Sequence, residues 1–279
     1  MRLGTFHVGG GESLLYQAEP GAPWCTASPG LAELTGGAPM TCGAPVDDLE
    51  PAPRLPFRPR TIFGIGLNYH DTVAEMGWQT PEVPYLFPKL SSSAIGDGEA
   101  VVVDTTLSTR VDWETELAVI IGRRARHVPA EKALDVVFGY TVANDISARD
   151  LQAEDGQWVR GKGLDTFCPL GPVVVTADEV PDPQALGVRT WVNGEQVQDG
   201  STADMIFDVR ALIAYLSSFF TLEPGDVILT GTPAGCGDFR TPRLALRPGD
   251  RLESEVEGIG RLVNPVVAPD RTNQVVGAT

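Results

Sequence analysis

The apolar and polar residues of this chain alternate mostly with the period of β-strands. In "VDWETELAVIIG" (111–122), Asp112, Glu114 and Glu116 occupy every second position before the run becomes wholly apolar. A period of two predicts a strand that carries these three carboxylates on one face. Asn193-Gly194 predicts a hairpin turn between two further strands. The remaining strands are predicted at 172–176, 189–192, 195–198, 226–231 and 251–258.

Helical periodicity is rarer. One helix is predicted with Thr202 or Asp204 as its N-cap, and its apolar positions are Ile206, Val209, Ile213, Leu216 and Phe220. Shorter helices are predicted at 130–137 and 147–153. Many short strands with few helices favour a β-rich α+β fold over alternating βαβ units.

Three regions differ in composition. Residues 1–60 form a small N-terminal segment that ends in the proline-rich linker "EPAPRLPFRPR" (50–60), where regular helix is disfavoured. Residues 61–267 carry the organised signals and are predicted to be the main folded domain. Residues 268–279 are predicted to be a frayed C-terminal tail.

Composition narrows the classes of function. The chain has 279 residues and a formal net charge of -16, which argues against a nucleic-acid partner. No apolar run approaches the ~20 residues that span a bilayer, and no secretory signal is recognised at the start, so no membrane partner is expected. The four cysteines are scattered without a CxxC pair, which favours a reducing cytoplasm. With three histidines in the chain, any metal is expected to be bound mainly by oxygen.

The acidic face of the 111–122 strand is the first candidate site. The next residues on that face are Ala118 and Ile120, so the carboxylates are expected at the mouth of a buried surface. A divalent cation such as Mg²⁺, Mn²⁺ or Ca²⁺ would compensate their charge. The alternative is an edge strand whose charged residues face water.

The stretch "FGYTVANDISARDLQ" (138–152) is the second candidate. It predicts a strand that ends at Asp145, followed by a capping box of Ser147 with Asp150 that opens a helical turn. Asp145 at the strand end could supply one metal ligand. Arg149 and Gln152 are three residues apart and would share a face, as donors to a substrate carboxylate. A capped turn with a surface ion pair is the alternative.

Two glycine-containing loops complete the candidates. "RGKGLDTFCPLGP" places Lys162 between glycines, where backbone can approach a ligand closely. "ILTGTPAGCG" ends a strand in a glycine-rich turn beside Thr230 and Thr232, and its N–H groups could serve an oxyanion. Each is an ordinary loop when taken singly.

Taken in order, these pieces resemble the fumarylacetoacetate hydrolase family over roughly residues 60–267. The matching stretches are "GLNY…EMG" (66–77), "DWETELAVIIG" (112–122), "GYTVANDISARDLQ" (139–152), "GKGLDTFCPLGP" (161–172), "VNGEQVQ" (192–198) and "PGDVILTGTPAG" (224–235). The resemblance implies the family's β-rich fold, a mixed β-sandwich roll, and a homodimer. It implies Mg²⁺ or Mn²⁺ bound by Glu114, Glu116 and Asp145, with Asp112 in a supporting role.

The resemblance also implies a small-molecule oxo-acid substrate held by Arg149, Gln152, Lys162 and Thr232. Family chemistries are C–C hydrolysis of acylpyruvates, decarboxylation of oxo acids, and keto–enol or double-bond isomerisation. In each, the metal stabilises an enolate. A catalytically silent metal-binding homologue is the alternative, which the retained Lys162 and three acids disfavour.

One departure from the family pattern concerns the lid motif N-Y-x-x-H-x-x-E, whose His and Glu activate water in hydrolytic members. The chain has "NYHDTVAE", which keeps Glu75 but places Thr72 at the histidine position. His70 lies two residues earlier, about 200° away on a helix, so it could replace that histidine only in an irregular lid. His70 is expected to be a surface or lid-packing residue. Glu75 and Lys162 are therefore expected to be catalytic. Hydrolase is the expected activity, with decarboxylase, isomerase, tautomerase or dehydratase as alternatives.

Overall fold

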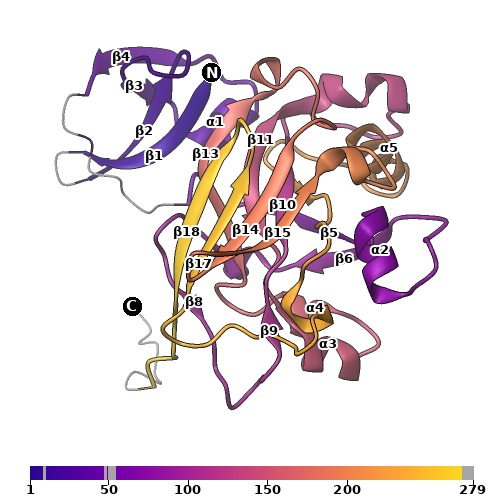
Figure 1. The fold of residues 1–279 in the computed structure, drawn as a ribbon. Coiled ribbons are helices and arrows are strands. Elements are labelled where there is room, and N and C mark those ends of the chain that lie inside the picture. Colours follow the sequence, from indigo (N-terminus) through magenta and orange to yellow (C-terminus); the bar gives the residue numbers. More distant parts are fainter. Residues whose placement is uncertain (9–10, 47–48, 50–54, 272–279) are drawn as a thin grey trace.

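The computed structural model describes residues 1–8, 11–46, 49 and 55–271. A large mixed sheet dominates it (Figure 1). Its eleven strands are β1 (Arg2–Val8), β2 (Gly11–Gln17), β3 (Cys25–Ser28), β4 (Thr41–Pro45), β5 (Ile62–Gly66), β6 (Tyr85–Lys89), β7 (Ala94–Ile95), β10 (Thr115–Ile121), β11 (Val137–Asn144), β13 (Cys168–Thr176) and β16 (Val227–Leu229). Their order is β4-β3-β2-β1-β13-β11-β10-β16-β5-β6, and β7 pairs with β13.

A second sheet packs against the centre of the first. Its strands, in spatial order, are β15 (Glu195–Ser201), β14 (Gly187–Val192), β17 (Arg251–Val256), β18 (Gly260–Val267) and β8 (Val101–Val102). Strands β14, β17 and β18 contact β10, β11 and β13 of the large sheet. A two-stranded ribbon of β9 (Val111–Asp112) and β12 (Ser147–Ala148) extends beyond the sheets. This arrangement confirms the predicted β-rich α+β fold.

Strand β10 lies at the centre of the core because every one of its seven residues is buried. Leu117, Val119 and Ile121 pack in the cluster that includes helix α5 (Val209–Phe219). Ala118 and Ile120 pack in a second cluster on the other face of the sheet. The apolar continuation of the acidic face is therefore buried, as predicted.

The N-terminal segment extends the large sheet. Strand β1 pairs antiparallel with β13, with Arg2 opposite Val175 and Leu3 opposite Val174. Strands β1 to β4 therefore continue the hydrogen-bonding pattern of the sheet that carries β10 and β11. Residues 50–54 of the predicted linker and 272–279 of the predicted tail lie outside the described residues.

The long helix begins later than predicted. Thr202 and Asp204 belong to a separate 3₁₀ turn, and α5 starts at Val209, so the expected N-caps are wrong. Asp208 caps α5, since its Oδ1 accepts a 2.7 Å hydrogen bond from the Ala211 N–H. The other α-helices are α1 (Leu31–Thr35), α2 (His70–Met76), α3 (Arg149–Glu154) and α4 (Val159–Lys162).

Short 3₁₀ helices fill several connections. They are η1 (Ser91–Ser93), η2 (Ala130–Val136), η3 (Ala177–Glu179), η4 (Thr202–Asp204) and η5 (Gly237–Phe239). The helix predicted at 130–137 is thus the 3₁₀ helix η2. The capping box is also wrong, because Ser147 lies in β12 and donates to the carbonyl oxygen of Asp145. Asp150 instead accepts from the Thr109 N–H at 2.9 Å.

All four cysteines are free. Within the described ranges, no helix is both long enough and apolar enough to cross a membrane.

Candidate metal and substrate site

Three carboxylates converge where strand β10 begins and strand β11 ends. Glu116 lies opposite Ala143 and Thr115 opposite Asn144, and the same register places Glu114 opposite Asp145, whose N–H donates to the Glu114 carbonyl oxygen at 2.8 Å. Residues directly opposite in an antiparallel pair share a face. Glu114, Glu116 and Asp145 consequently present carboxylate oxygens within 4.8 Å of one another, all buried.

Lys162 lies between two of these carboxylates. Its Nζ is 2.5 Å from Glu114 Oε2 and 2.6 Å from Asp145 Oδ2, and its side chain is 2% exposed. The ammonium also lies 4.9 Å from the centre of the Phe87 ring. Helix α4 ends at Lys162, so a short helix fixes the lysine that the sequence placed in a glycine-containing loop.

A second buried lysine, Lys89 on β6, forms an ion pair with the other carboxylate oxygen of Asp145. Its Nζ lies 2.5 Å from Asp145 Oδ1 and also donates to the carbonyl oxygen of Lys162. Lys89 was not among the site residues predicted from the sequence. The signal was present in "YLFPK", where strand alternation places Lys89 on the same buried face as Phe87.

Glu116 is held differently, by the backbone of the glycine-rich turn. The Gly231 N–H donates to Glu116 Oε2 at 2.6 Å, so this N–H serves a protein carboxylate and not a substrate oxyanion. Gly231 has a φ of +90°, and a Cβ there would lie 2.8 Å from the Cβ of Asn68, so glycine is required. In the described part of the chain, no Lys or Arg forms an ion pair with Glu116.

The electrostatics of the three acids differ accordingly. Burial alone would raise the pKa of Glu114, but Arg149 and Lys162 outweigh it and lower that pKa to about 2. Burial, Asp145 and Glu114 together raise the pKa of Glu116 well above its ordinary value. Of these two glutamates, Glu116 is therefore the one whose charged form is disfavoured.

This donor set fits a divalent cation. The convergent trio and Asp112 are buried carboxylates, and the buried cations in contact with these four are Lys89, Arg149 and Lys162. The carboxylate without a cationic partner is Glu116, and it belongs to the convergent trio. Hard oxygen ligands select ions such as Mg²⁺, Mn²⁺ or Ca²⁺, and such an ion would balance the charge that raises the pKa of Glu116.

Arg149 connects the acidic trio to the substrate side of the site. Its Nε lies 2.7 Å from Asp112 Oδ1, and its Nη2 lies 2.6 Å from Glu114 Oε1. Its Nη1 donates to Gln152 Oε1 at 3.3 Å, so the predicted shared face of Arg149 and Gln152 is confirmed. Asp112 is thus a partner of Arg149. Burial raises the pKa of Asp112 to about 6, although Arg149 opposes that shift.

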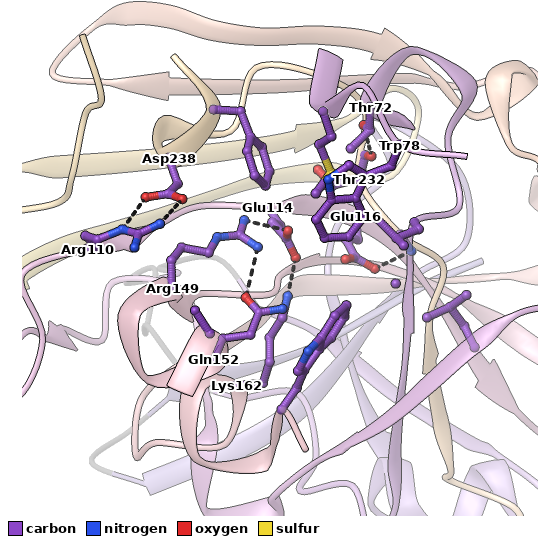
Figure 2. Close-up of a pocket in the computed structure, with 18 residues that line it drawn as sticks. Thr72, Trp78, Arg110, Glu114, Glu116, Arg149, Gln152, Lys162, Thr232 and Asp238 are labelled. Carbon is purple, nitrogen blue, oxygen red and sulfur yellow. Dashed lines mark hydrogen bonds and ion pairs between the residues drawn. The ribbon is translucent and has the colours of Figure 1, made fainter. Parts of the chain in front are cut away.

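Part of this site forms the wall of a cavity of about 200 Å³ (Figure 2). Glu114, Glu116, Arg149, Gln152, Lys162 and Thr232 all contribute to its wall, so the structure brings these predicted residues together. Apolar side chains, among them Met76, Trp78, Trp158 and Phe239, form the rest. The volume lies below the range of drug-sized sites and suits a small metabolite.

Thr232 has limited freedom within this wall. Its hydroxyl donates to the Thr115 carbonyl oxygen at 2.8 Å and accepts from Gln198 Nε2 at 2.9 Å. The hydroxyl proton is therefore directed into the protein. In this arrangement the side chain can accept a further hydrogen bond from a ligand but cannot donate one.

The lid motif forms the regular helix α2. Thr72 faces the cavity, and its hydroxyl donates to the Thr232 carbonyl oxygen at 2.8 Å. His70 is exposed, as predicted from its angular distance to Thr72. Glu75 is exposed as well, is not part of the cavity wall, and accepts from the Gly235 N–H at 3.0 Å. The structure therefore does not bring Glu75 together with the other predicted site residues.

Comparison with known proteins identifies relatives along most of the chain. The family model described as fumarylacetoacetate (FAA) hydrolase C-terminal matches residues 61–267. The oxaloacetate tautomerase Fahd2a of Rattus norvegicus is 46% identical over 211 residues, covering 75% of this chain and 67% of the relative. An uncharacterized protein of Archaeoglobus fulgidus is 47% identical over 216 residues, covering 77% and 82%. The chain thus spans about two thirds of the length of the rat protein, which is mitochondrial, and the cytoplasmic location stays a prediction.

Solved structures agree with this grouping. The fumarylacetoacetate hydrolase of Exiguobacterium antarcticum is 38% identical with a TM-score of 0.87, covering 96% of this chain and 100% of that one. The 5-carboxymethyl-2-hydroxymuconate delta-isomerase of Mycobacterium smegmatis is 37% identical with a TM-score of 0.81, covering 97% and 100%. The chain therefore belongs to the fumarylacetoacetate hydrolase family, whose members are divalent-metal-dependent enzymes.

Proposed function

We propose that this protein is a metal-dependent tautomerase that interconverts the keto and enol forms of a short 2-oxo acid of the oxaloacetate type. The observation that carries the proposal is the lid: Thr72, which does not titrate near neutral pH, faces the cavity at the position where hydrolytic relatives need a histidine. Relatives named oxaloacetate tautomerase, at 46–47% identity, support it.

Tautomerisation requires less of the lid than hydrolysis does. One proton moves between the carbon beside the carbonyl and the carbonyl oxygen, and no water is added. Hydrolysis needs a base that activates water, and among the described residues no histidine lines the cavity. Glu75, the other lid group, accepts from the Gly235 N–H outside the cavity wall. A proton shift at a polarised oxo acid is therefore the chemistry that this wall supports best.

The residues divide the work as follows. Glu114, Glu116 and Asp145 would hold Mg²⁺ or Mn²⁺, which when bound polarises the oxo-acid carbonyl and stabilises enolate charge. Lys162 is the group placed to hold a proton at the carbonyl oxygen, because it lines the cavity and its ammonium lies 2.5 Å from Glu114 Oε2 and 2.6 Å from Asp145 Oδ2.

The charge of Lys162 is secured by its neighbours. Burial would lower its pKa, but Asp145 and Glu114 outweigh burial and raise it. The lysine therefore stays protonated at neutral pH. Arg149 and Gln152 orient the carboxylate of the substrate, since both line the cavity on the side next to Glu114.

Hydrolysis of an acylpyruvate is the second candidate, favoured by the TM-score of 0.87 with the Exiguobacterium antarcticum hydrolase. One experiment separates the two. Mg²⁺-loaded protein should accelerate the loss of the ultraviolet absorbance of enol-oxaloacetate, with little cleavage of acetylpyruvate under the same conditions. Cleavage of acetylpyruvate at a rate comparable to that of the tautomerisation would favour the hydrolase.

A further inference from the structure

A second arginine lies at the far end of the cavity. Arg110 precedes strand β9, and its carbonyl oxygen accepts from the Arg149 N–H at 2.8 Å, so the two arginines are neighbours across the ribbon. Both side chains line the cavity. Figure 2 shows Arg110 on one side, Glu116 and Thr72 on the other, and Arg149 with Gln152 between them.

Asp238 fixes the orientation of Arg110. Its two carboxylate oxygens lie 2.8 Å from Arg110 Nε and 2.6 Å from Arg110 Nη2, which is a side-on bidentate pair. Asp238 is itself anchored, because its N–H donates to Asp112 Oδ2 at 2.9 Å, and Asp112 also binds Arg149. The pair is thus built into the same network as the acidic trio.

The pair leaves part of the guanidinium free. A guanidinium has five N–H groups, and Asp238 takes one on Nε and one on Nη2 of Arg110. The Arg110 side chain is 33% exposed, whereas that of Arg149 is 7% exposed and donates to Asp112, Glu114 and Gln152. Arg110 is therefore the arginine with more donors to offer a ligand.

We propose that Arg110 binds a second carboxylate of the substrate, so that the site selects short oxo acids with a carboxylate at each end. The inference rests on the proposed function for one point, that the oxo-acid end of the substrate lies at Glu114, Glu116 and Lys162. A distal carboxylate would then point away from these acids toward the part of the cavity wall formed by Arg110, Asp238 and Phe239. The charge of Asp238 is compensated there by its bidentate pair with Arg110. A carboxylate buried there without a donor is costly, and Arg110 supplies the donor.

The test compares two inert ligands that differ in the distal carboxylate. L-malate and L-lactate are both 2-hydroxy acids, and malate alone has the second carboxylate. Calorimetry on Mg²⁺-saturated protein should show that wild type binds malate more tightly. Arg110→Gln should lower malate affinity about 10–100-fold, the range for a hydrogen bond to a charged group, and leave lactate affinity unchanged. Arg110→Lys should recover part of the loss.

Arg243→Gln is the matched control. Arg243 also lies near Asp238, with Nε 3.8 Å from Oδ1, but it is 63% exposed and is not part of the cavity wall. Removing its charge should leave the malate preference intact. A wild type without preference for malate, equal losses for both ligands in Arg110→Gln, or an equal effect in Arg243→Gln would overturn the proposal. Because binding involves no turnover, a malate preference without tautomerase activity would contradict the proposed function alone.

Discussion

The hydroxyl of Thr72 donates a 2.8 Å hydrogen bond to the carbonyl oxygen of Thr232, which joins the lid helix to the glycine-rich turn beside the acidic trio. This contact holds Thr72 at the wall of the cavity, and a threonine hydroxyl cannot act as a general base there. The lid itself is the regular helix α2, and His70 is exposed on it and does not line the cavity, so His70 is not placed to replace the missing imidazole.

Thr72→His should therefore raise acylpyruvate hydrolysis. A positioned general base contributes ~10²–10⁴-fold, so even partial restoration should be measurable, while tautomerisation should change little. Steady-state rates on acetylpyruvate and oxaloacetate measure both effects. His70→Ala is the control and should alter neither rate. Loss of hydrolysis in His70→Ala would show that His70 is the base after all.

The metal site makes a prediction about Glu116. Glu116→Ala should lower Mg²⁺ or Mn²⁺ affinity by more than the ~10–100-fold that follows loss of an outer partner of a ligand, because a direct ligand is removed. Calorimetric titration gives the affinity. Glu195→Ala removes an exposed carboxylate on β15 as the matched control and should bind metal like wild type. Equal affinity in Glu116→Ala would refute the metal assignment.

The raised pKa of Glu116 gives a signed pH dependence. The metal-free folded protein keeps a proton on Glu116 above the ordinary glutamate value of about 4.3, and metal must displace it. Metal affinity should therefore rise with pH until the pH passes the raised pKa, and below that pKa each bound ion should release about one proton. Glu116→Gln should lack this proton release. Calorimetry in buffers of different ionisation enthalpy counts the protons.

The same shift predicts how metal-free stability depends on pH. A carboxyl group whose pKa is raised on folding makes the folded state bind its proton more tightly, so stability falls as pH rises from the unfolded value through the folded one. Metal-free Glu116→Gln cannot lose that proton and should have a higher Tm than metal-free wild type at neutral pH. Thermal unfolding with a chelator present measures the difference. A lower Tm in the variant would contradict the raised pKa.

Arg149 is predicted to matter for folding as well as for substrate. Arg149→Ala leaves buried Asp112 and Glu114 without their guanidinium, and breaking a buried pair costs about 3–5 kcal/mol of unfolding free energy. Asp112→Asn in that background should recover part of the loss. Denaturant titration of the single and double variants measures both. Arg149→Lys keeps a charge and is the variant for kinetics, where KM should rise more than kcat falls.

The acidic trio could be anticipated in part from the sequence. Strand alternation places Glu114 and Glu116 on one face, and the apolar residues that follow on that face indicate burial. The approach of Asp145 depends on the register between β10 and β11, which alternation does not define. The position of Asp145 at a strand end indicated a possible ligand, the resemblance to the family grouped it with the two glutamates, and the register explains that grouping physically.

Other features depend on contacts between distant segments. Arg110 and Asp238 are 128 positions apart, and Lys89 and Asp145 are 56 apart, so no local pattern brings either pair together. The prediction of the N-cap of α5 was wrong for a different reason. Several possible caps lie within a few residues, and the tertiary fold uses Ser201 for a 3₁₀ turn and Asp208 for the helix.

The most direct test of the proposed function follows the proton itself. Oxaloacetate in deuterated water is monitored by NMR for exchange of the protons on the carbon beside the carbonyl, with wild-type protein and with Glu116→Ala, with and without Mg²⁺. Wild-type protein with Mg²⁺ should accelerate the exchange well above the rate with the metal alone, without forming cleavage or decarboxylation products. Glu116→Ala should not accelerate the exchange. Exchange no faster than with Mg²⁺ alone, or product formation that keeps pace with exchange, would contradict the proposed function.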